Sequence, residues 1–249
     1  MYKPGKFNFR ASYAAGFRTP TLSELYATDI AKKNDRLTIG NLDLKSEKNN
    51  YFSLSAEYVH ERFSVSVNAF YNNIRDMIDY NTIATGDKAM EQYGHKEVRQ
   101  RDNIAEAKVH GINVSANAYL GAGFNLSGGY THLNTQDVEL EQPIDKSIKN
   151  AYNINAQWAH SWKIYRLNIN LNGRINSKRF SKSYGYAPEY QLWNLNTRHS
   201  FNLKSVIIEP GCGMENLFDY MDDRPYNSNY ATLTPGRSFY ISLSLKFKS

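Results

Sequence analysis

The stretch Gly236-Arg237-Ser238-Phe239-Tyr240-Ile241-Ser242-Leu243-Ser244-Leu245-Lys246-Phe247, close to the C-terminus, decides the fold. From Phe239 onward, apolar residues alternate with serine, tyrosine and lysine. Because successive side chains of a β-strand point to opposite faces, this period of two predicts a strand with one apolar and one polar face. The edge of a water-soluble sheet shows the same pattern. The fold class therefore depends on how often such strands recur and on how they are joined.

The same alternation recurs along the whole chain. Most of the expected strands are about 10 to 13 residues long, close to the roughly 9–11 residues that a tilted strand needs to cross a bilayer. About ten strands are expected in all. They run over residues 7–18, 49–59, 63–79, a segment ending at 118, 124–134, 152–158, 167–175, 191–201, 206–218 and 239–247.

The connections between these strands alternate strictly between long and short. The long ones are expected at residues 19–47, 81–100, 138–148, 181–188 and 220–235. Outer-membrane barrels have short periplasmic turns and long extracellular loops, whereas a soluble sandwich has no reason to segregate its loops by length. The predicted fold class is therefore all-β, an antiparallel transmembrane β-barrel. Because the C-terminus of such barrels lies in the periplasm, the long connections are expected to be extracellular.

The composition agrees with a barrel and excludes other classes. With 19 Tyr, 12 Phe and 3 Trp, 14% of the residues are aromatic, which suits the aromatic girdles of membrane barrels. A tyrosine-rich soluble sandwich is the alternative. Mean hydropathy is −0.62 and no apolar run approaches 18 residues, so a transmembrane helix is excluded. The single cysteine, Cys212, excludes an internal disulfide and a multi-cysteine metal site.

The net charge of +6 arises from basic residues that are scattered and often stand beside acids. No basic stripe of the kind that binds nucleic acid is present, so we expect no nucleic-acid partner. Lys32-Lys33, Lys178-Arg179 and Lys182 suggest contacts with anionic lipid headgroups, although a solvated loop is the favoured interpretation.

Five motifs stand in a fixed order along the chain. They are Ala15–Pro20 followed by Glu24-Leu25-Tyr26, Gly40–Lys48, Phe70–Tyr80, Val109–Ile112, and Glu215–Tyr220 with Pro235–Tyr240. In this order and spacing they resemble the barrel of TonB-dependent outer-membrane receptors. The positions that carry the resemblance most directly are Arg18, Pro20, Asn41, Leu44, Asn216, Leu217, Phe218, Gly236 and Arg237.

The resemblance implies a 22-stranded barrel with a plugged lumen, which imports scarce nutrients across the bacterial outer membrane with energy from TonB. Residues 1–249 are expected to be the C-terminal portion of that barrel, because only about ten strands and no plug are recognised. Residues 1–6 contain no apolar signal-peptide region, so the start of an exported protein is expected to be missing. The TonB complex would be contacted only through the missing plug, and outer-membrane lipid or lipopolysaccharide would surround the barrel.

Ten strands leave two unpaired edges, which the hydrocarbon does not tolerate. Three explanations stay open at this point. The missing strands come from elsewhere, the fragment is inactive, or the ten strands close on themselves.

Within the family, haem and cobalamin are the favoured cargoes, with iron-siderophores as a further possibility. Haem receptors of this family carry a histidine between the two motifs that Phe17–Pro20 and Asn41–Leu44 resemble. Here no histidine occurs at residues 21–39, and His95 is the only histidine in an expected extracellular loop. Aromatic residues in the long loops offer stacking surfaces for a large ligand, or else form an interfacial girdle. The candidate ligand-binding residues are Tyr26, Tyr80, Tyr93, His95, Tyr184, Tyr186, Tyr226 and Tyr230.

No catalytic residue, resident metal or cofactor is expected. A ten-stranded outer-membrane protease would need Asp/His pairs at the outer rim to activate water, and His95 is the only histidine on that side. A passive pore or a non-functional barrel remnant is the other alternative, because polar lumen faces suit both. The ordered motifs favour a receptor, and we therefore expect the protein not to be an enzyme.

Overall fold

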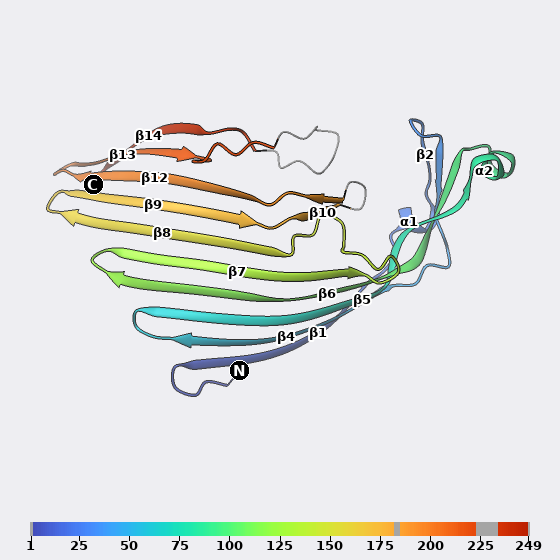
Figure 1. Ribbon diagram of the computed structural model, residues 1–249, viewed down its shortest axis with the longest axis horizontal. Helices are drawn as coiled ribbons and strands as arrows, with labels where there is room; N and C mark the ends of the chain where they lie inside the picture. The colour runs from blue at the N-terminus through green and yellow to red at the C-terminus, as the bar shows by residue number, and fades with distance from the viewer. Residues whose placement is uncertain (1, 182–184, 223–233, 249) are drawn as a thin grey trace.

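The computed structural model describes residues 2–181, 185–222 and 234–248, apart from the side chain of residue 105. One curved antiparallel sheet dominates, in the order β1-β4-β5-β6-β7-β8-β9-β12-β13-β14 (Figure 1). The long strands are β1 (Phe7–Arg18), β4 (Glu47–Val59), β5 (Phe63–Thr85), β6 (Glu97–Gly121), β7 (Phe124–Asp137), β8 (Asn150–Trp162), β9 (Tyr165–Asn176), β12 (Tyr190–Asn202), β13 (Val206–Glu215) and β14 (Ser238–Phe247). The predicted all-β architecture of about ten strands is confirmed.

The sheet is open. Among the described residues, β1 pairs only with β4 and β14 only with β13, and Figure 1 shows these two strands at opposite sides of the sheet. The idea that the ten strands close on themselves is therefore wrong. Each edge strand leaves backbone groups without a ladder partner along its free side, so the described strands do not form a closed barrel.

The two faces of the sheet differ in chemistry, as the alternation predicts. Residues paired across strands share a face, and the apolar face carries side chains that the protein itself does not cover. On β14, Ile241 is 88% exposed and Leu243 is 66% exposed. The opposite face is rich in asparagine and serine, as in the pairs of Ser66 with Ser115 and of Asn155 with Asn172. Water suits only the second face, so the first requires hydrocarbon around it.

Aromatic residues gather near both ends of the sheet. At the end with the short turns, the ring centroids of Tyr165 and Phe201 are 5.0 Å apart. Near the other end, those of Tyr13 and Phe52 are 4.6 Å apart, and Tyr71 stands in the same cross-strand row. From Phe63 to Tyr71, β5 advances eight residues, which is about 27 Å along the strand. For a strand tilted by about 40°, this length spans about 20 Å of membrane thickness, which fits within the roughly 25 Å apolar band of outer-membrane barrels.

The short turns all lie at one end of the sheet, on the left in Figure 1. They connect β4 to β5, β6 to β7, β8 to β9 and β12 to β13, as predicted. In the turn between β6 and β7, Ala122 has a φ of 49°, and the flanking Gly121 and Gly123 have φ of 90° and 86°. The glycines adopt this left-handed backbone at little cost, which allows the tight reversal.

Several predicted boundaries are wrong at the other end. The expected connection at 81–100 is too long, because β5 continues to Thr85 and β6 begins at Glu97, and α2 occupies Gly86–Tyr93 between them. Ladder pairing resumes beyond a bulge at Arg75–Asp76, where Asp76 has a φ of 55°. In addition, β13 ends at Glu215 and not at 218, because Asn216 has a φ of 51°. Polar strands outside an apolar environment carry no alternation from which they can be recognised.

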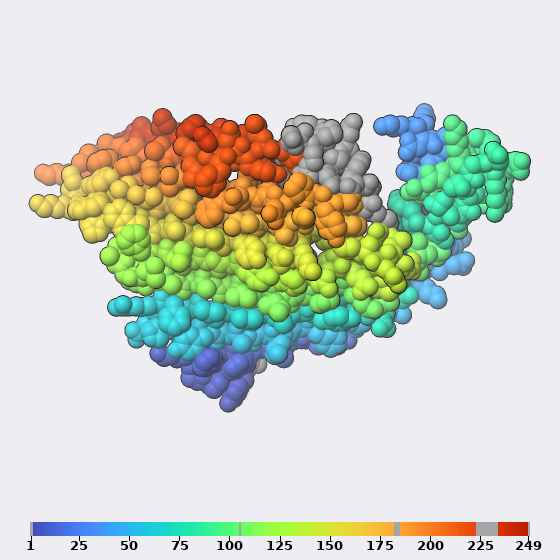
Figure 2. All heavy atoms as spheres, viewed as in Figure 1, coloured from blue at the N-terminus to red at the C-terminus, as the bar shows by residue number. Residues whose placement is uncertain are grey.

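The long connections contain further elements. These are α1 (Leu22–Tyr26), β2 (Thr28–Ala31), β3 (Arg36–Ile39), α2 (Gly86–Tyr93), β10 (Arg179–Ser181) and β11 (Gly185–Ala187). Strand β3 pairs in parallel with the start of β6, so two connections that are distant in sequence form one body. We call this body the α2 projection: β2, β3, α2, the end of β5 from residue 79 and the start of β6 to residue 103. It extends beyond the sheet on the right in Figures 1 and 2.

The α2 projection has its own small core, made by Ala84, Ala89 and Val98, with Leu37 and Tyr93 among the side chains packed against it. Elsewhere in the described chain few apolar residues are buried, because no second layer packs against the sheet. Neither helix in the part of the chain that the structure describes is long and apolar enough to span a membrane.

Replacing Leu243 with Arg is expected to impair assembly in the membrane by about 2–4 kcal/mol, because the side chain points into the hydrocarbon. Heat-modifiable migration of the protein on gels measures assembly. The matched control is Ser244→Arg, which places the same charge on the polar face opposite Glu209. Equal heat-modifiability of the two variants would contradict the assignment of the faces.

Candidate functional site

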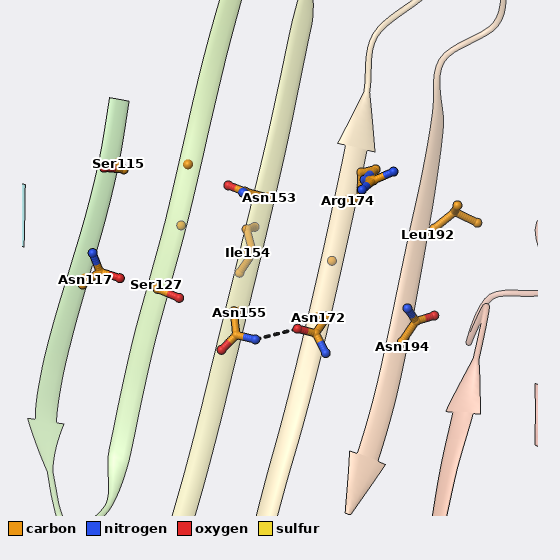
Figure 3. Close-up of a pocket in the computed structure, with 13 residues that line it drawn as sticks. Ser115, Asn117, Ser127, Asn153, Ile154, Asn155, Asn172, Arg174, Leu192 and Asn194 are labelled. Carbon is orange, nitrogen blue, oxygen red and sulfur yellow. Dashed lines mark hydrogen bonds between the residues drawn. The ribbon is translucent and has the colours of Figure 1, made fainter. Parts of the chain in front are cut away.

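A shallow polar hollow lies on the asparagine-rich face and crosses β6, β7, β8, β9 and β12 (Figure 3). Its volume is about 590 Å³. The polar side chains that line it are Ser115, Asn117, Ser127, Asn153, Asn155, Asn172, Arg174 and Asn194. Within it, Asn155 donates a hydrogen bond from Nδ2 to Oδ1 of Asn172 at 2.5 Å. Amides both donate and accept hydrogen bonds, so this wall suits water or a polar partner and not a lipid.

Glycine shapes this hollow. A Cβ on Gly129 would stand 2.3 Å from Oδ1 of Asn153 on the next strand, so the asparagine lies across the glycine. Arg174 is the only charged residue of the lining, and Figure 3 shows it at one end of the group of asparagines. The lining therefore offers mainly neutral hydrogen-bond donors and acceptors.

At the end with the long connections, Arg18 joins three elements. Its Nη1 is 2.9 Å from Oε2 of Glu24 in α1, and its Nε donates to Oε2 of Glu47 in β4 at 2.7 Å. Oε1 of Glu47 also accepts the backbone N–H of Ile78 at 3.0 Å. Hydrogen bonds from Arg18, and then from Thr21, lower the pKa of Glu24 to about 2. Arg18, a residue of the first motif, thus holds the first long connection against the sheet.

The segment before β4 packs closely on α1. A Cβ on Gly40 would lie 2.5 Å from the carbonyl oxygen of Leu25, so only glycine fits there. Asn41 donates its backbone N–H to the Glu24 carbonyl at 3.0 Å, and its Oδ1 accepts the N–H of Asp43 at 2.9 Å. Pro20 and Leu44 are half-buried beside these contacts. These motif positions support the loop.

Sequence reasoning missed Asn103, which clamps the same region from β6. Its Nδ2 donates to the carbonyl oxygens of Lys45 at 3.0 Å and Asp76 at 2.6 Å, and its Oδ1 accepts the N–H of Lys45 at 2.7 Å. An asparagine within a polar strand has no distinguishing pattern, so no signal in the sequence marks it.

The second clamp closes the hairpin before β14. Asn216 is only 4% exposed, and its Nδ2 donates to the carbonyl oxygens of Tyr220 at 2.7 Å and Pro235 at 3.1 Å. Its Oδ1 accepts the N–H of Tyr220 at 2.8 Å. Leu217 donates its N–H to the carbonyl of Trp193 at 2.7 Å.

The remaining residues of this motif support the same hairpin. The Phe218 ring lies edge-on to Trp193, with centroids 6.4 Å apart. Arg237 donates its N–H to Oδ1 of Asp219 at 2.6 Å, and a Cβ on Gly236 would lie 3.1 Å from the same atom. The closing motif therefore has a structural role.

The candidate ligand-binding residues lie on separate elements, and they differ in accessibility. Tyr26 on α1 is 67% exposed, and Tyr186 on β11 is 56% exposed. Tyr80 on β5 lies under Arg101 of β6, whose guanidinium carbon is 3.7 Å from the ring centroid. Tyr93 packs instead against the small core of the α2 projection. Tyr184, Tyr226 and Tyr230 lie outside the described residues.

His95 is held by the turn between β2 and β3. Its Nδ1 is 2.9 Å from Oδ1 of Asp35, and the N–H of Lys96 reaches the other carboxylate oxygen at 3.3 Å. The His95 hydrogen bond, with help from Lys96, lowers the pKa of Asp35. In the part of the chain that the structure describes, no group of three His, Cys, Asp or Glu side chains is arranged to hold a metal ion.

Comparison with known proteins defines the class. A family model described as "TonB dependent receptor-like, beta-barrel" matches residues 1–217, and the chain belongs to this family. Similar solved structures include a variant of the ferric enterobactin receptor PfeA from Pseudomonas aeruginosa, with 20% identity, a TM-score of 0.74, and coverage of 98% of this chain and 38% of that one.

Two further solved structures share the fold. The ferric preacinetobactin receptor BauA from Acinetobacter baumannii has 15% identity, a TM-score of 0.68, and coverage of 97% of this chain and 34% of that one. The copper transporter OprC has 13% identity, a TM-score of 0.70, and coverage of 95% and 36%. The chain thus spans little more than a third of the length of these proteins. At such identities the likeness concerns the fold alone.

Replacing Asn216 with Ala is expected to destabilise the barrel by about 2–4 kcal/mol, because buried backbone groups lose their partners and alanine tolerates the left-handed backbone poorly. The temperature at which heat-modifiable migration is lost measures the effect. Asn117→Ala, which removes an exposed amide from the polar face, is the matched control. An Asn216 variant as stable as the control would contradict the clamp.

The Arg18–Glu24 pair predicts an acid-dependent loss of stability. Because the pKa of Glu24 is lowered in the folded state, its stabilisation is complete above its ordinary pKa of 4.5 and disappears as the pH falls towards about 2. Arg18 is 44% exposed, so we expect only about 1–2 kcal/mol. Melting of wild type and Glu24→Gln between pH 6 and pH 2 tests this. The variant should start less stable and lose less, and parallel curves would contradict it.

Proposed function

We propose that this chain forms the C-terminal part of the barrel of an outer-membrane receptor that takes up a scarce small-molecule nutrient. The observation that carries the proposal is the opposition of faces along every long strand, apolar outward and amide-rich inward. The placing of all long connections at one end supports it as well. In this proposal, residues 1–249 are one portion of the barrel domain, the apolar face meets outer-membrane lipid, and the polar hollow faces the lumen.

The open edges of the sheet support a longer protein as the functional unit. Further antiparallel strands beside β1 and β14 would satisfy the free backbone groups. A plug within the lumen would then contact the amide-rich hollow, and TonB would act through that plug and not through this wall. A passive pore or an inactive remnant remains the competing proposal, and uptake measurements separate the two.

We further propose that the cargo is a metal chelate recognised at the end that carries the long connections. Tyr80 and Arg101 offer an aromatic ring beneath a cation, a combination that suits an anionic ligand with flat rings. Tyr26 and Tyr186 are exposed at the same end and add stacking surface. Ferric siderophores, haem and cobalamin all belong to this chemical class.

One observation favours haem among these cargoes. Metal-ligating histidines usually donate their second ring nitrogen to a carboxylate or carbonyl, and Nδ1 of His95 stands 2.9 Å from the Asp35 carboxylate. This arrangement orients the ring and leaves Nε2 as the ligating atom.

Growth of a deletion strain, complemented with the full-length receptor gene, on one chelate at a time tests the proposal. Ferric catecholate siderophore, haem and cyanocobalamin serve as the separate sources. Growth that depends on both the receptor and TonB is expected with one of them. An assembled barrel that supports growth on none would favour the passive pore.

Arg101→Gln is expected to reduce uptake of the accepted chelate about tenfold, because a hydrogen bond from a charged group to an anionic ligand contributes about 1.5–3 kcal/mol. Initial uptake of labelled chelate by whole cells measures the effect. Lys88→Gln, an exposed cation on α2 removed in the same way, is the matched control. If both variants keep wild-type uptake, the Tyr80–Arg101 pair is not part of the ligand site.

An epitope inserted near Gly86, at the start of α2, is expected to be extracellular. The α2 projection lies at the end of the sheet opposite the short turns. Antibody labelling of intact cells should therefore succeed without permeabilisation. Labelling that appears only after permeabilisation would invert the proposed topology.

A further inference from the structure

Strand β2 of the α2 projection keeps a free edge, since it pairs only with β3 among the described residues. Strand β6 pairs with β5 along one edge. Along its other edge it pairs with β7 and then, beyond the end of that ladder, with β3. Strand β2 therefore takes the place above the wall that β8 takes within it, and its free edge points along the rim of the sheet. In Figure 2 the blue atoms of β2 lie at the upper margin of the α2 projection.

The ladder between β2 and β3 determines which backbone groups face the free edge. Gly40 donates its N–H to the carbonyl of Ala27 at 2.9 Å, so these two residues form a hydrogen-bonded pair. In an antiparallel ladder, such pairs alternate with pairs that are not hydrogen-bonded. The backbone of Asp29, two residues further on, is therefore turned toward β3. Thr28 and Ile30 direct their N–H and C=O groups away from β3, where an incoming strand would find them.

The side chain of Ile30 ends an apolar row of the α2 projection. Ile30 stands opposite Leu37, and Leu37 stands opposite Val98. Val98 stands in turn opposite Ala84. The last three residues form or contact the small core, whereas Ile30 is 48% exposed. A further strand with an apolar side chain opposite Ile30 would cover this surface and extend the core by one position.

Proteins usually protect an exposed edge strand, and β2 carries few of the usual devices. Proline, lysine and β-bulges are common among these devices. Residues Thr28–Ala31 contain neither proline nor lysine, and their pairing with β3 shows no register shift. The charge within the strand is that of Asp29, which is exposed. The edge is therefore open to pairing, with one acidic side chain to select the partner.

Asp29 selects against a second copy of this chain. Two copies of β2 that both use Thr28 and Ile30 in an antiparallel pair place Asp29 opposite its own copy. Like charges directly opposite each other destabilise such a pair, whereas a lysine or arginine in that position stabilises it. The edge thus fits a segment of a different protein.

We propose that β2 is a docking site for an extended segment of another protein, which adds to the free edge as an antiparallel strand. This segment carries an apolar residue opposite Ile30 and a cationic residue opposite Asp29. Main-chain hydrogen bonds supply the affinity, and the alternating side chains supply the specificity. The receptor then has a protein-binding site beside its small-molecule site. This inference rests on the extracellular location of the α2 projection in the proposed function.

The fluorophore-labelled peptide Glu-Thr-Val-Lys-Val-Thr is a probe with this pattern. In the antiparallel register its first valine lies opposite Ile30 and its lysine opposite Asp29. Fluorescence anisotropy with the full-length receptor in neutral detergent measures binding. N-methylation of both valines, whose N–H groups face β2, is expected to weaken binding about 30-fold. N-methylation of the lysine, whose N–H faces away from β2, is the matched control and should change the affinity by less than about twofold.

The charge of Asp29 provides a second test. Asp29→Lys is expected to weaken binding of the lysine peptide about fivefold and to strengthen binding of the peptide with glutamate in place of lysine. Glu91→Lys makes the same change of charge at an exposed position of α2, and it should leave both affinities unchanged.

Three results would overturn the inference. They are equal weakening by the two N-methylations, unchanged affinities in Asp29→Lys, and no saturable binding of the lysine peptide up to about 1 mM. If Asp29→Lys does not assemble, the N-methylated peptides still decide. Binding to the receptor in detergent but not to intact cells would contradict the proposed topology, and with it the proposed function, and not the site itself.

Discussion

The backbone hydrogen bonds of the sheet are the constraint on which the rest of the structure depends. Hydrocarbon offers no partner for an N–H or a C=O, so each strand that meets lipid must be paired along its length. The eight inner strands meet this demand through antiparallel neighbours on both sides, and β1 and β14 meet it on one side only. At the free sides of β1 and β14, backbone groups therefore stay without a ladder partner.

A single layer of strands buries little, so the end with the long connections is held by polar contacts. Arg18 joins β1, α1 and β4, Asn103 joins β6 to the segment before β4, and Asn216 closes the last hairpin. Most described positions that carry the family resemblance belong to such contacts. The residues that carry the resemblance therefore anchor the loops, whereas Arg101, for which we propose a role in binding the cargo, lies outside these motifs.

The strands within the membrane could be predicted because alternation is imposed there by two different environments. Residues 7–18 match β1 exactly in extent, and the turns before β5 and β7 were located correctly. Prediction failed where that contrast ends. Both ends of the expected connection at 81–100 are paired strand, with α2 between them. Tyr93, expected to bind a ligand, packs against the core of the α2 projection. The parallel pairing of β3 with β6 joins residues about sixty positions apart, and no local sequence pattern predicts it.

The sequence by itself determined the two faces of each strand, the aromatic belts, the alternation of short and long connections and the family. These features are local, because a period of two and a tight turn depend only on neighbouring residues. Only the tertiary structure decided the register, the open edges and the contact of His95 with Asp35. It also placed Ile30 opposite Leu37 at the edge of the α2 projection. Such pairings depend on how distant segments align, and the alignment is selected by the hydrogen-bond ladder of the whole sheet and not by any one strand.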